Sequence, residues 1–295
     1  MATRVCVVGS VNMDLTLDVD SLPRPGETVL ASSFTYAPGG KGGNQAVAAA
    51  RARAHVQFVG AVGDDAAADQ LRAHLQANGV GLDGTVRLPG PSGAAIITVD
   101  ASGENTVVVA PGANGQVTLT TAVVRAVVAD CDVLLTQLEI PVATAAAAAR
   151  AARSAGAVVI VNASPAGQNH IALAELAAVA DVVIANEAEA DEWKWRPNHL
   201  VVTLGARGAR YVGVDGEFQV PAPAVKAVDT TGAGDVFAGV LAANWPPDPG
   251  ANPALKAQRL RALQRACAAG ALATLVPGAG DCAPHAEAIE AALPS

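Results

Sequence analysis

The chain has 295 residues, 51% of them hydrophobic and only 3% aromatic, so its length supports a large core that must be built from Ala, Val and Leu. A net charge of −8, from 19 basic and 27 acidic side chains, argues against nucleic acid or an anionic membrane as the main partner, because both need a basic surface. The amino terminus has no signal-peptide pattern, and no segment reaches the roughly 20 apolar residues of a membrane span, which favours a cytoplasmic protein. The four cysteines form no C-x-x-C pair and are expected to be reduced and mostly buried.

Short β-branched runs alternate with alanine-rich stretches along most of the chain. The runs are interpreted as strands buried on both faces: 5–8, 56–59, 133–135, 158–161, 182–184 and 201–204. The stretches between them are interpreted as helices: 44–53, 65–77, 118–129, 142–154 and 171–179. This alternation predicts an α/β fold, a doubly wound and mostly parallel sheet flanked by helices, in one domain that spans residues 1–295.

Two pairs of segments have the alternating pattern of hairpin strands instead: 15–19 with 29–35, and 94–99 with 106–109. Such hairpins do not fit easily into a parallel core. We therefore expect a small β-sheet lid, inserted at about 13–38 and 92–110, over the strand ends where α/β proteins bind ligands. Further along the chain, the proline-rich segment 245–253 is expected to be a surface loop between two helices.

The stretch from Asp229 to Asp235 carries the most information about function. Its two acidic ends bracket a loop of small residues, and a helical run, 236–243, follows at once. Backbone N–H groups at a helix start bind anions, and glycine lets a phosphate approach the backbone closely. A carboxylate at this position, Asp235, suits a base that deprotonates a hydroxyl attacking phosphorus. The alternative is an ordinary glycine-rich turn with an acidic cap.

Two further motifs lie near the start of the chain. Asp14, close to Asn12, follows the first strand and is a candidate acceptor for two sugar hydroxyls; the alternative is an Asx turn that opens a loop. The glycine-rich segment 39–44 precedes an alanine-rich helix and matches neither a Walker A loop nor a dinucleotide fingerprint. Its glycines still indicate a close approach of the backbone to another group, and its Lys41 either meets an anion or is solvated.

Three more motifs follow later strands. Glu139 either binds a hydroxyl or is a capping or solvated side chain. Glu189 either organises Mg²⁺ through water or belongs to a solvated first helical turn. Residues 203–208 form either the floor of a nucleotide site or a simple hairpin. Because the carboxyl ends of parallel strands meet at one edge of a sheet, we expect these motifs to gather at one site.

Together the motifs resemble those of the ribokinase-like (pfkB) carbohydrate kinases. The similar segments are, in chain order, 9–14, 25–28, 39–46, 186–189, 203–208 and 229–235. The first three resemble the family's first signature and the last resembles its second, while the two between them are similar to its magnesium and nucleotide segments. The likeness extends from about residue 4 to about residue 285, and two signatures in this order and at this separation are highly specific.

The resemblance implies transfer of a phosphoryl group from ATP to the 5-hydroxyl of D-ribose. Asp235 matches the catalytic base, and Gly232, Ala233 and Gly234 match the anion hole that stabilises charge on the transferred group. The positions that hold the sugar in this family match Asn12, Asp14, Gly39, Gly40, Lys41, Asn44, Glu139 and Asp235. The positions that hold ATP match Asn186, Thr203, Gly205, Gly208 and Gly234.

The resemblance also implies metal ions and a partner subunit. Glu189 matches the residue that organises Mg²⁺. A site for a monovalent cation, normally K⁺, lies beside the anion hole in this family, and its positions match Asp229, Thr231, Ala273, Val276, Gly278 and Cys282. The family's β-sheet lid usually forms the interface of a homodimer, which implies the same role for the hairpins of this chain.

Three departures from the family pattern stand out. Gly43 occupies a position where Ala is common, which is expected to loosen the loop and affect sugar affinity. Cys282 occupies a position where Ser often helps to hold the monovalent cation. The segment 186–199 is shorter than usual, so a helix is expected to be missing there; activity is expected to survive, because the flanking site residues are present.

Other hypotheses stay open beside ribose phosphorylation. In the first of these hypotheses, the chain is a kinase of the same family whose acceptor is another sugar or a nucleoside, such as deoxyribose, fructose or adenosine. Alternatively the chain is a non-catalytic sugar or nucleotide sensor, or a dinucleotide-dependent oxidoreductase. A degraded base or anion hole would indicate a sensor, and a dinucleotide fingerprint after the first strand would indicate an oxidoreductase; the sequence has neither.

Overall fold

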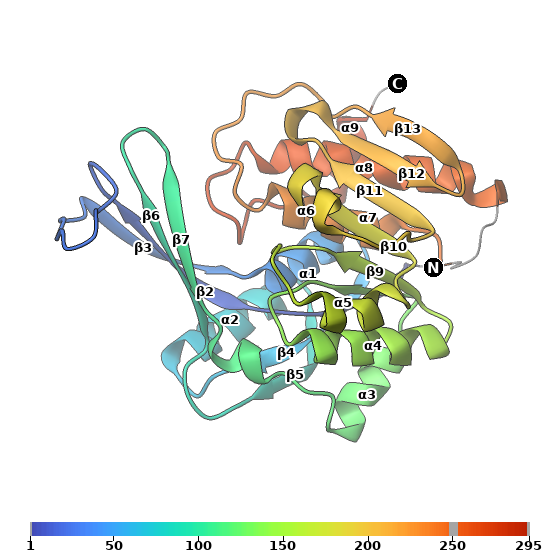
Figure 1. Ribbon diagram of the computed structural model, residues 1–295, viewed down its shortest axis with the longest axis horizontal. Coiled ribbons are helices and arrows are strands. Elements are labelled where there is room, and N and C mark those ends of the chain that lie inside the picture. The colour runs from blue at the N-terminus through green and yellow to red at the C-terminus, as the bar shows by residue number, and fades with distance from the viewer. Residues whose placement is uncertain (1, 248–252, 294–295) are drawn as a thin grey trace.

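The computed structural model describes residues 2–247 and 253–293, which form two β-sheets with helices packed around the larger one (Figure 1). The strands of the larger sheet are β1 (Arg4–Val8), β4 (His55–Val62), β5 (Gly81–Arg87), β8 (Val133–Thr136), β9 (Val158–Asn162), β10 (Val182–Asn186), β11 (His199–Thr203), β12 (Ala209–Gly213) and β13 (Gly216–Val220). Their order is β13-β12-β11-β10-β9-β8-β1-β4-β5. All neighbours are parallel except β12, which runs antiparallel to β11 and β13. The predicted mostly parallel sheet is confirmed.

Helices cover both faces of this sheet. One face carries α1 (Lys41–Arg51), α2 (Ala66–Ala77), α7 (Ala233–Asn244), α8 (Lys256–Ala273) and α9 (Ala286–Ala291). The other carries α3 (Ala122–Ala129), α4 (Val142–Ser154) and α5 (His170–Ala177). The shorter helices are η1 (Gly112–Gln116), α6 (Glu187–Glu192), η2 (Gly205–Arg207) and η3 (Pro253–Leu255). Alternate residues of the central strands enter the two cores: Val5 and Val7 of β1 belong to the first, Cys6 and Val8 to the second.

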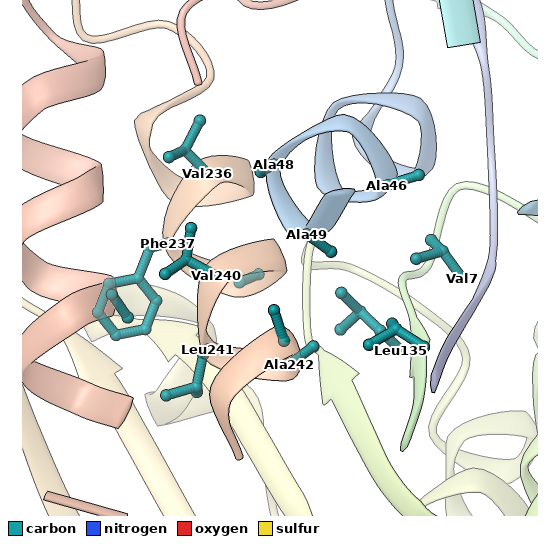
Figure 2. Packing of buried hydrophobic residues seen from close by; sticks show 14 of the residues in the cluster. Val7, Ala46, Ala48, Ala49, Leu135, Val236, Phe237, Val240, Leu241 and Ala242 are labelled. Atoms are coloured by element: carbon teal, nitrogen blue, oxygen red, sulfur yellow. The ribbon is translucent and has the colours of Figure 1, made fainter. Parts of the chain in front are cut away.

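Small residues determine how closely α1 and α7 pack. A Cβ added at Gly239 of α7 would collide with the carbonyl oxygen of Gln45 and lie 2.8 Å from Cβ of Ala48, both in α1. Figure 2 shows the apolar side chains of the two helices in this cluster, with Val7 and Leu135 of the sheet nearby. The close packing brings the first turns of α1 and α7 together at the same edge of the sheet.

The second sheet projects away from the core, at the left of Figure 1. Its strands are β2 (Asn12–Asp18), β3 (Ser33–Gly39), β6 (Gly93–Val99) and β7 (Asn105–Ala110), in the order β3-β2-β6-β7. The predicted hairpin at 94–99 and 106–109 is confirmed. The strand predicted at 29–35 lies instead at 33–39, because β2 pairs Asp18 with Ser33 and Asn12 with Gly39. Leu30, which contributes to the apolar pattern of 29–35, is 91% exposed in the loop before it.

Several other boundaries differ from the prediction. Helix α1 begins at Lys41 rather than at 44, and α7 begins at Ala233 rather than at 236. Helix α3 begins only at Ala122, because the side chain of Thr121 accepts a hydrogen bond from the backbone and caps it. Strands β5 and β13 are absent from the prediction, because glycine and charged residues interrupt their apolar pattern.

The predicted surface loop 245–253 is only partly described. Trp245 and Pro246 are buried rather than exposed, because the indole packs on the ring of His199 at 5.1 Å between centroids; residues 248–252 lie outside the described residues. All four cysteines are free and buried, as predicted. None of the helices formed by residues 2–247 and 253–293 is both long and apolar enough to cross a bilayer.

Candidate active site

Two adjoining cavities lie where the carboxyl ends of β10 and β11 meet the first turns of α1 and α7. The larger has a volume of about 780 Å³ and the smaller about 200 Å³. Asn186, Thr203 and Gly234 line both, so the two volumes are neighbours. The predicted nucleotide positions line the larger cavity, whereas Lys41 and Asp235 are the two predicted sugar positions that line the smaller one.

Asp235 lies in the first turn of α7 and lines the smaller cavity. Asn44 Nδ2 donates a hydrogen bond to its Oδ2 at 3.1 Å, and Gln45 Nε2 donates to its Oδ1 at 3.0 Å. The residue is 8% exposed. Before it, Gly232 has a φ of 78°, and a Cβ there would lie 2.8 Å from Cα of Ala279. The loop conformation that presents the carboxylate therefore requires glycine.

Backbone donors surround this carboxylate. The N–H of Ala233 makes a long hydrogen bond of 3.3 Å to the carbonyl of Thr230. Within residues 2–247 and 253–293, the N–H groups of Gly232 and Gly234 have no backbone or side-chain acceptor. Both glycines line the smaller cavity, at the positive end of the α7 dipole. Donors for the predicted anion hole thus border the cavity.

Asp14 lies within β2 rather than in an Asx turn. Burial, together with the charges of Glu139 and Asp235, raises the pKa of Asp14 to about 7. Among the described residues its buried Oδ1 has no hydrogen-bond partner. The carboxylate presses against Gly39, where any Cβ would collide with it. A buried oxygen left unpaired is costly, so this position suits a ligand that supplies a hydroxyl donor.

Glu139 connects the turn after β1 with the start of α1. Its Oε2 accepts hydrogen bonds from Ser10 Oγ at 2.6 Å and from the backbone N–H of Lys41 at 3.3 Å. The carboxylate is therefore a cap, but of a helix far away in sequence. Burial disfavours the charge on Lys41, yet the carboxylates of Asp235, Glu139 and Glu189 outweigh burial and raise the pKa of Lys41. Lys41 lines the smaller cavity, so it is not simply solvated.

The glycine-rich segment 39–44 is helical over most of its length. Gly40, which precedes α1, has a φ of 84°, and a Cβ there would lie 2.6 Å from the backbone N of Asn12. A Cβ at Gly42 would lie 2.7 Å from a carbonyl of the turn after β1. These glycines are needed for close backbone packing. Gly43 also lies in the helix rather than in a loop, and a Cβ there would meet Val11 Cγ2 at 3.2 Å; its effect on sugar affinity stays a prediction.

The larger cavity is lined mainly by small and apolar residues, and its volume is in the roughly 300–1,000 Å³ range of ligand pockets. All five predicted nucleotide positions line it: Asn186, Thr203, Gly205, Gly208 and Gly234. Segment 203–208 both borders this cavity and leads from β11 into antiparallel β12, so its two interpretations are compatible. The φ of Gly208 is 90°, and a Cβ there would collide with the carbonyl of Val220.

Glu189 belongs to a capping box at the start of α6. Its N–H donates to Asn186 Oδ1 and its Oε2 accepts from the N–H of Asn186, both at 2.8 Å. The residue is 9% exposed and lines the smaller cavity, so it is not a solvated first turn. No group of three or more His, Cys, Asp or Glu side chains in the described chain is arranged to hold a metal. A Mg²⁺ ion here would depend on water and phosphate oxygens, which is its usual preference.

The predicted monovalent-cation positions cluster beside the loop before α7. Both carboxylate oxygens of Asp229 accept backbone N–H groups at 2.8 Å, one from Thr231 and one from Gly278. Burial acts to raise the pKa of Asp229, but these hydrogen bonds prevail and lower it. Ala273 ends α8, and its carbonyl accepts the N–H of Val276 at 3.2 Å. Asp229 therefore ties the loop before α7 to the segment after α8.

Cys282 packs against the same loop. Burial and the charge of Asp235 raise the pKa of its thiol to about 11, so the sulfur stays protonated at neutral pH. Its Sγ donates to the carbonyl of Ala279 at 3.3 Å and lies 3.9 Å from that of Thr231. A Cβ added at Gly232 would lie 3.1 Å from Sγ. The cysteine fills space behind the loop and offers a neutral thiol rather than a hydroxyl oxygen.

Some polar side chains that support the site are absent from the sequence-based prediction. Asn114 of η1 accepts from the N–H of Val11 at 3.1 Å, and it donates to the carbonyl of Val11 at 3.0 Å and to Asn12 Oδ1 at 2.8 Å. Gln137 Nε2 donates to Gln45 Oε1 at 2.7 Å. Gln45 lies in a recognised motif, but nothing around Asn114, 102 positions from Asn12, points to this contact.

The model of the pfkB family of carbohydrate kinases matches residues 2–286. The chain belongs to this family. It is a sugar kinase, a transferase that phosphorylates a carbohydrate.

The similar proteins include kinases that are named for two different sugars, ribose and deoxyribose. Ribokinase from Bacillus subtilis (strain 168) is 37% identical over 244 residues, which cover 79% of this chain and 82% of that protein. Deoxyribokinase from Salmonella typhi is 33% identical over 264 residues, with 81% and 84% covered. The structure of Arabidopsis thaliana ribokinase complexed with ribose and ATP is 27% identical, with a TM-score of 0.84 and both chains covered fully. These likenesses confirm the ribokinase-like fold.

The segment between the magnesium motif and β11 is short in this chain. Helix α6 ends at Glu192 and β11 begins at His199, with no helix between them. The indoles of Trp193 and Trp195 pack there edge to face, 5.3 Å apart, and Trp195 lies 6.3 Å from the ring of His170. Aromatic packing fills this segment, and residues on both sides of it line the cavities.

Proposed function

We propose that this carbohydrate kinase transfers the γ-phosphoryl group of ATP to the 5-hydroxyl of D-ribose. The position of Asp235 carries the proposal: it lies at the start of α7, on a small polar cavity that adjoins one large enough for a nucleotide. A sugar in the smaller cavity has a hydroxyl between this carboxylate and the terminal phosphate of ATP. The relatives named ribokinase support ribose as the acceptor.

Asp235 accepts the proton of the attacking hydroxyl. The backbone N–H groups of Gly232, Ala233 and Gly234 stabilise the charge that develops on the transferred group, and the ammonium of Lys41 adds to them. Phosphoryl transfer needs little covalent chemistry from the protein, so positioning and charge stabilisation account for most of the rate.

The sugar is held from the lid side and from the start of α1. The unpaired Oδ1 of Asp14 accepts one hydroxyl, and Glu139 accepts another beside its bond to Ser10. The complete set of sugar positions is Asn12, Asp14, Gly39, Gly40, Lys41, Asn44, Glu139 and Asp235. ATP occupies the larger cavity and contacts Asn186, Thr203, Gly205, Gly208 and Gly234.

Two kinds of metal ion complete the site. A bound Mg²⁺ would neutralise phosphate charge, and Glu189, whose Oε1 has no hydrogen-bond partner among the described residues, would hold it through water. A monovalent cation such as K⁺ fits the oxygen donors beside the anion hole, since carbonyl rings replace the hydration shell of such ions. These donors are Asp229 and the carbonyls of Thr231, Ala273, Val276 and Gly278. The protonated thiol of Cys282 adds little to them.

A second copy of the chain covers the exposed face of the lid. Tyr36 and Ile96 are paired with Leu15, and Ile96 with Val108, so these apolar side chains form a row across the four strands. Tyr36, Ile96 and Val108 are 61%, 42% and 60% exposed, which is unfavourable for a monomer in water. Light scattering on the purified protein tests the homodimer, and a monomeric Tyr36→Glu variant would place the interface on the lid.

A coupled assay of ADP release tests the reaction. Ribose, deoxyribose, fructose and adenosine are compared by kcat/KM, with and without K⁺, and ribose is expected to give the highest value. Asp235→Asn should lower kcat by about 10²- to 10⁴-fold with little loss of fold, whereas the control Asp83→Asn, at an exposed position, should leave kcat unchanged. A clear preference for another acceptor would replace ribose. Binding without turnover of any acceptor would indicate a sensor.

A further inference from the structure

A chain of buried side-chain amides leads away from Asp235 into the core. Gln45 Nε2 donates to Asp235 Oδ1 at 3.0 Å, and Gln137 Nε2 donates to Gln45 Oε1 at 2.7 Å. Gln45 Nε2 also lies 3.3 Å from Asn162 Oδ1. Gln45 and Gln137 are both 0% exposed, and neither is among the residues that line the two cavities. They therefore reach the site only indirectly, through the carboxylate of Asp235 and through Asn162, which lines the smaller cavity.

The charge of Asp235 determines the orientation of each amide. An ionised carboxylate only accepts hydrogen bonds, so Gln45 must direct its NH₂ group to it. The carbonyl oxygen of Gln45 then faces Gln137, which must in turn direct its own NH₂ group to Gln45. This order leaves Gln137 Oε1 buried, without a partner in the described structure. An unpaired buried acceptor costs about 1–3 kcal/mol, so apolar residues of similar size would give a more stable core.

We propose that Gln45 is a positioning residue for the base and that Gln137 acts through Gln45. The proposal rests on the proposed role of Asp235. The terminal torsion of an aspartate is broad, so only hydrogen bonds fix the plane of its carboxylate. Asn44 holds one oxygen but belongs to the predicted sugar positions as well. Gln45 lines neither cavity, and it keeps Oδ1 in place while the sugar binds and the proton is transferred.

Three variants test this role: Gln45→Leu, Gln137→Leu and the double variant. Gln45→Leu should lower kcat by about 10- to 100-fold, because misplacement of a reacting group by about 1 Å costs this much. The KM values for sugar and ATP should change by less than about twofold, since Gln45 touches neither cavity. Gln137→Leu should lower kcat by a smaller factor, because Gln45 keeps its bond to Asp235. In an Asp235→Asn background, Gln45→Leu should have almost no further effect on kcat.

Melting temperature separates positioning from stability. Gln45→Leu leaves both polar ends of Gln137 unpaired and should lower the melting temperature. In the double variant, Gln137→Leu removes the unpaired amide of Gln137, so the melting temperature should rise again while kcat stays low. The matched control is Gln57→Leu, which removes a glutamine bonded to Asp83 at 3.2 Å near the amino end of β4; its kcat should equal that of the wild type.

Two outcomes would overturn the proposal. Either kcat of Gln45→Leu stays within threefold of the wild type, or kcat of the double variant recovers together with its stability. The wild type is assayed in parallel with the sugar panel. If it phosphorylates no acceptor, the proposed function fails and the role of Gln45 fails with it. If the wild type is active and Gln45→Leu is equally active, only the role of Gln45 is lost.

Discussion

Asn44 and Asp235, 191 positions apart in the chain, are joined by a hydrogen bond of 3.1 Å because α1 and α7 pack side by side. An amide that the sequence assigns to the sugar therefore already contacts the candidate base. One side chain thus links the binding of the acceptor to the orientation of the carboxylate, and this link has a kinetic consequence.

Asn44→Leu should change both kinetic parameters, unlike Gln45→Leu. A hydrogen bond to a charged group contributes about 1.5–3 kcal/mol, so we expect the sugar KM to rise and kcat to fall by roughly tenfold each. Initial rates at saturating ATP measure both. An unchanged KM would show that Asn44 serves the base alone.

Sugar affinity should increase as the pH rises through 7. The pKa of Asp14 is raised to about 7, so its carboxyl is mostly protonated at pH 6 and mostly ionised at pH 8. Hydroxyl groups donate more strongly to a carboxylate than to a neutral acid, so the dissociation constant should fall by up to about tenfold over this interval. Calorimetric titration of the sugar without ATP measures it. The Asp14→Asn variant should bind the sugar weakly, and its dissociation constant should not change between pH 6 and pH 8. A pH dependence that persists in this variant would assign the titration to another group.

Replacement of two neighbouring glycines should have opposite effects on folding. Gly232→Ala introduces a Cβ at a φ of 78° and 2.8 Å from Cα of Ala279, which should destabilise the protein by about 1–3 kcal/mol and distort the anion hole. Gly234→Ala is the matched control, because a Cβ there has nothing within 4 Å and lies in a helix, where alanine is preferred by up to about 1 kcal/mol. Denaturant unfolding compares the two. Equal stability of both variants would contradict the strained loop.

Acid should weaken the fold through His199. This side chain is 1% exposed, its Nδ1 is bonded to Tyr211 Oη at 2.7 Å, and burial together with the charge of Arg259 lowers its pKa to about 4. The unfolded chain, with a histidine pKa near 6.5, then binds more protons between pH 6.5 and 4. The contribution of neutral, buried His199 to the free energy of unfolding is fully present above pH 6.5. It is lost as the pH falls toward 4, by at most about 3 kcal/mol.

Urea unfolding between pH 7 and pH 4.5 measures this loss. His199→Gln keeps a partner for Tyr211 and removes the titrating group, so the variant should lose less stability over the same interval. Carboxylates titrate equally in both proteins, and the difference between them isolates His199. Parallel curves for the two proteins would contradict the assignment.

The large sheet and the edge that carries the site follow from local sequence. Strands such as 158–161 are apolar on both faces, which requires helices on both sides and places every strand end at a common edge. Asp14, Asn186 and Thr203 lie at or near the ends of apolar runs, so their neighbourhood is predictable without knowledge of any contact.

The remainder depends on contacts between distant segments. Glycines at 40 and 42 suggest a loop, but the first turn of α1 is helical and needs them because the turn after β1 lies against it. The bonds of Gln137 to Gln45 and of Asn114 to Asn12 span 92 and 102 positions and leave no periodic pattern in the sequence. The register of β3 depends on its pairing with β2, and the apolar residues before it suggest an earlier start.

A core built from small residues, with few aromatic ones, allows α1 and α7 to pack closely. The base belongs to one helix and both amides that hold it belong to the other, so the length of these hydrogen bonds depends on the spacing between the helix axes. Gly239 and Ala48 set that spacing, and there is no room for one additional methyl group. A substitution there would contact neither sugar nor nucleotide, yet it would pull the donors away from the carboxylate. The position of the Asp235 carboxylate relative to its donors therefore depends partly on the smallest side chains of the core, Gly239 and Ala48.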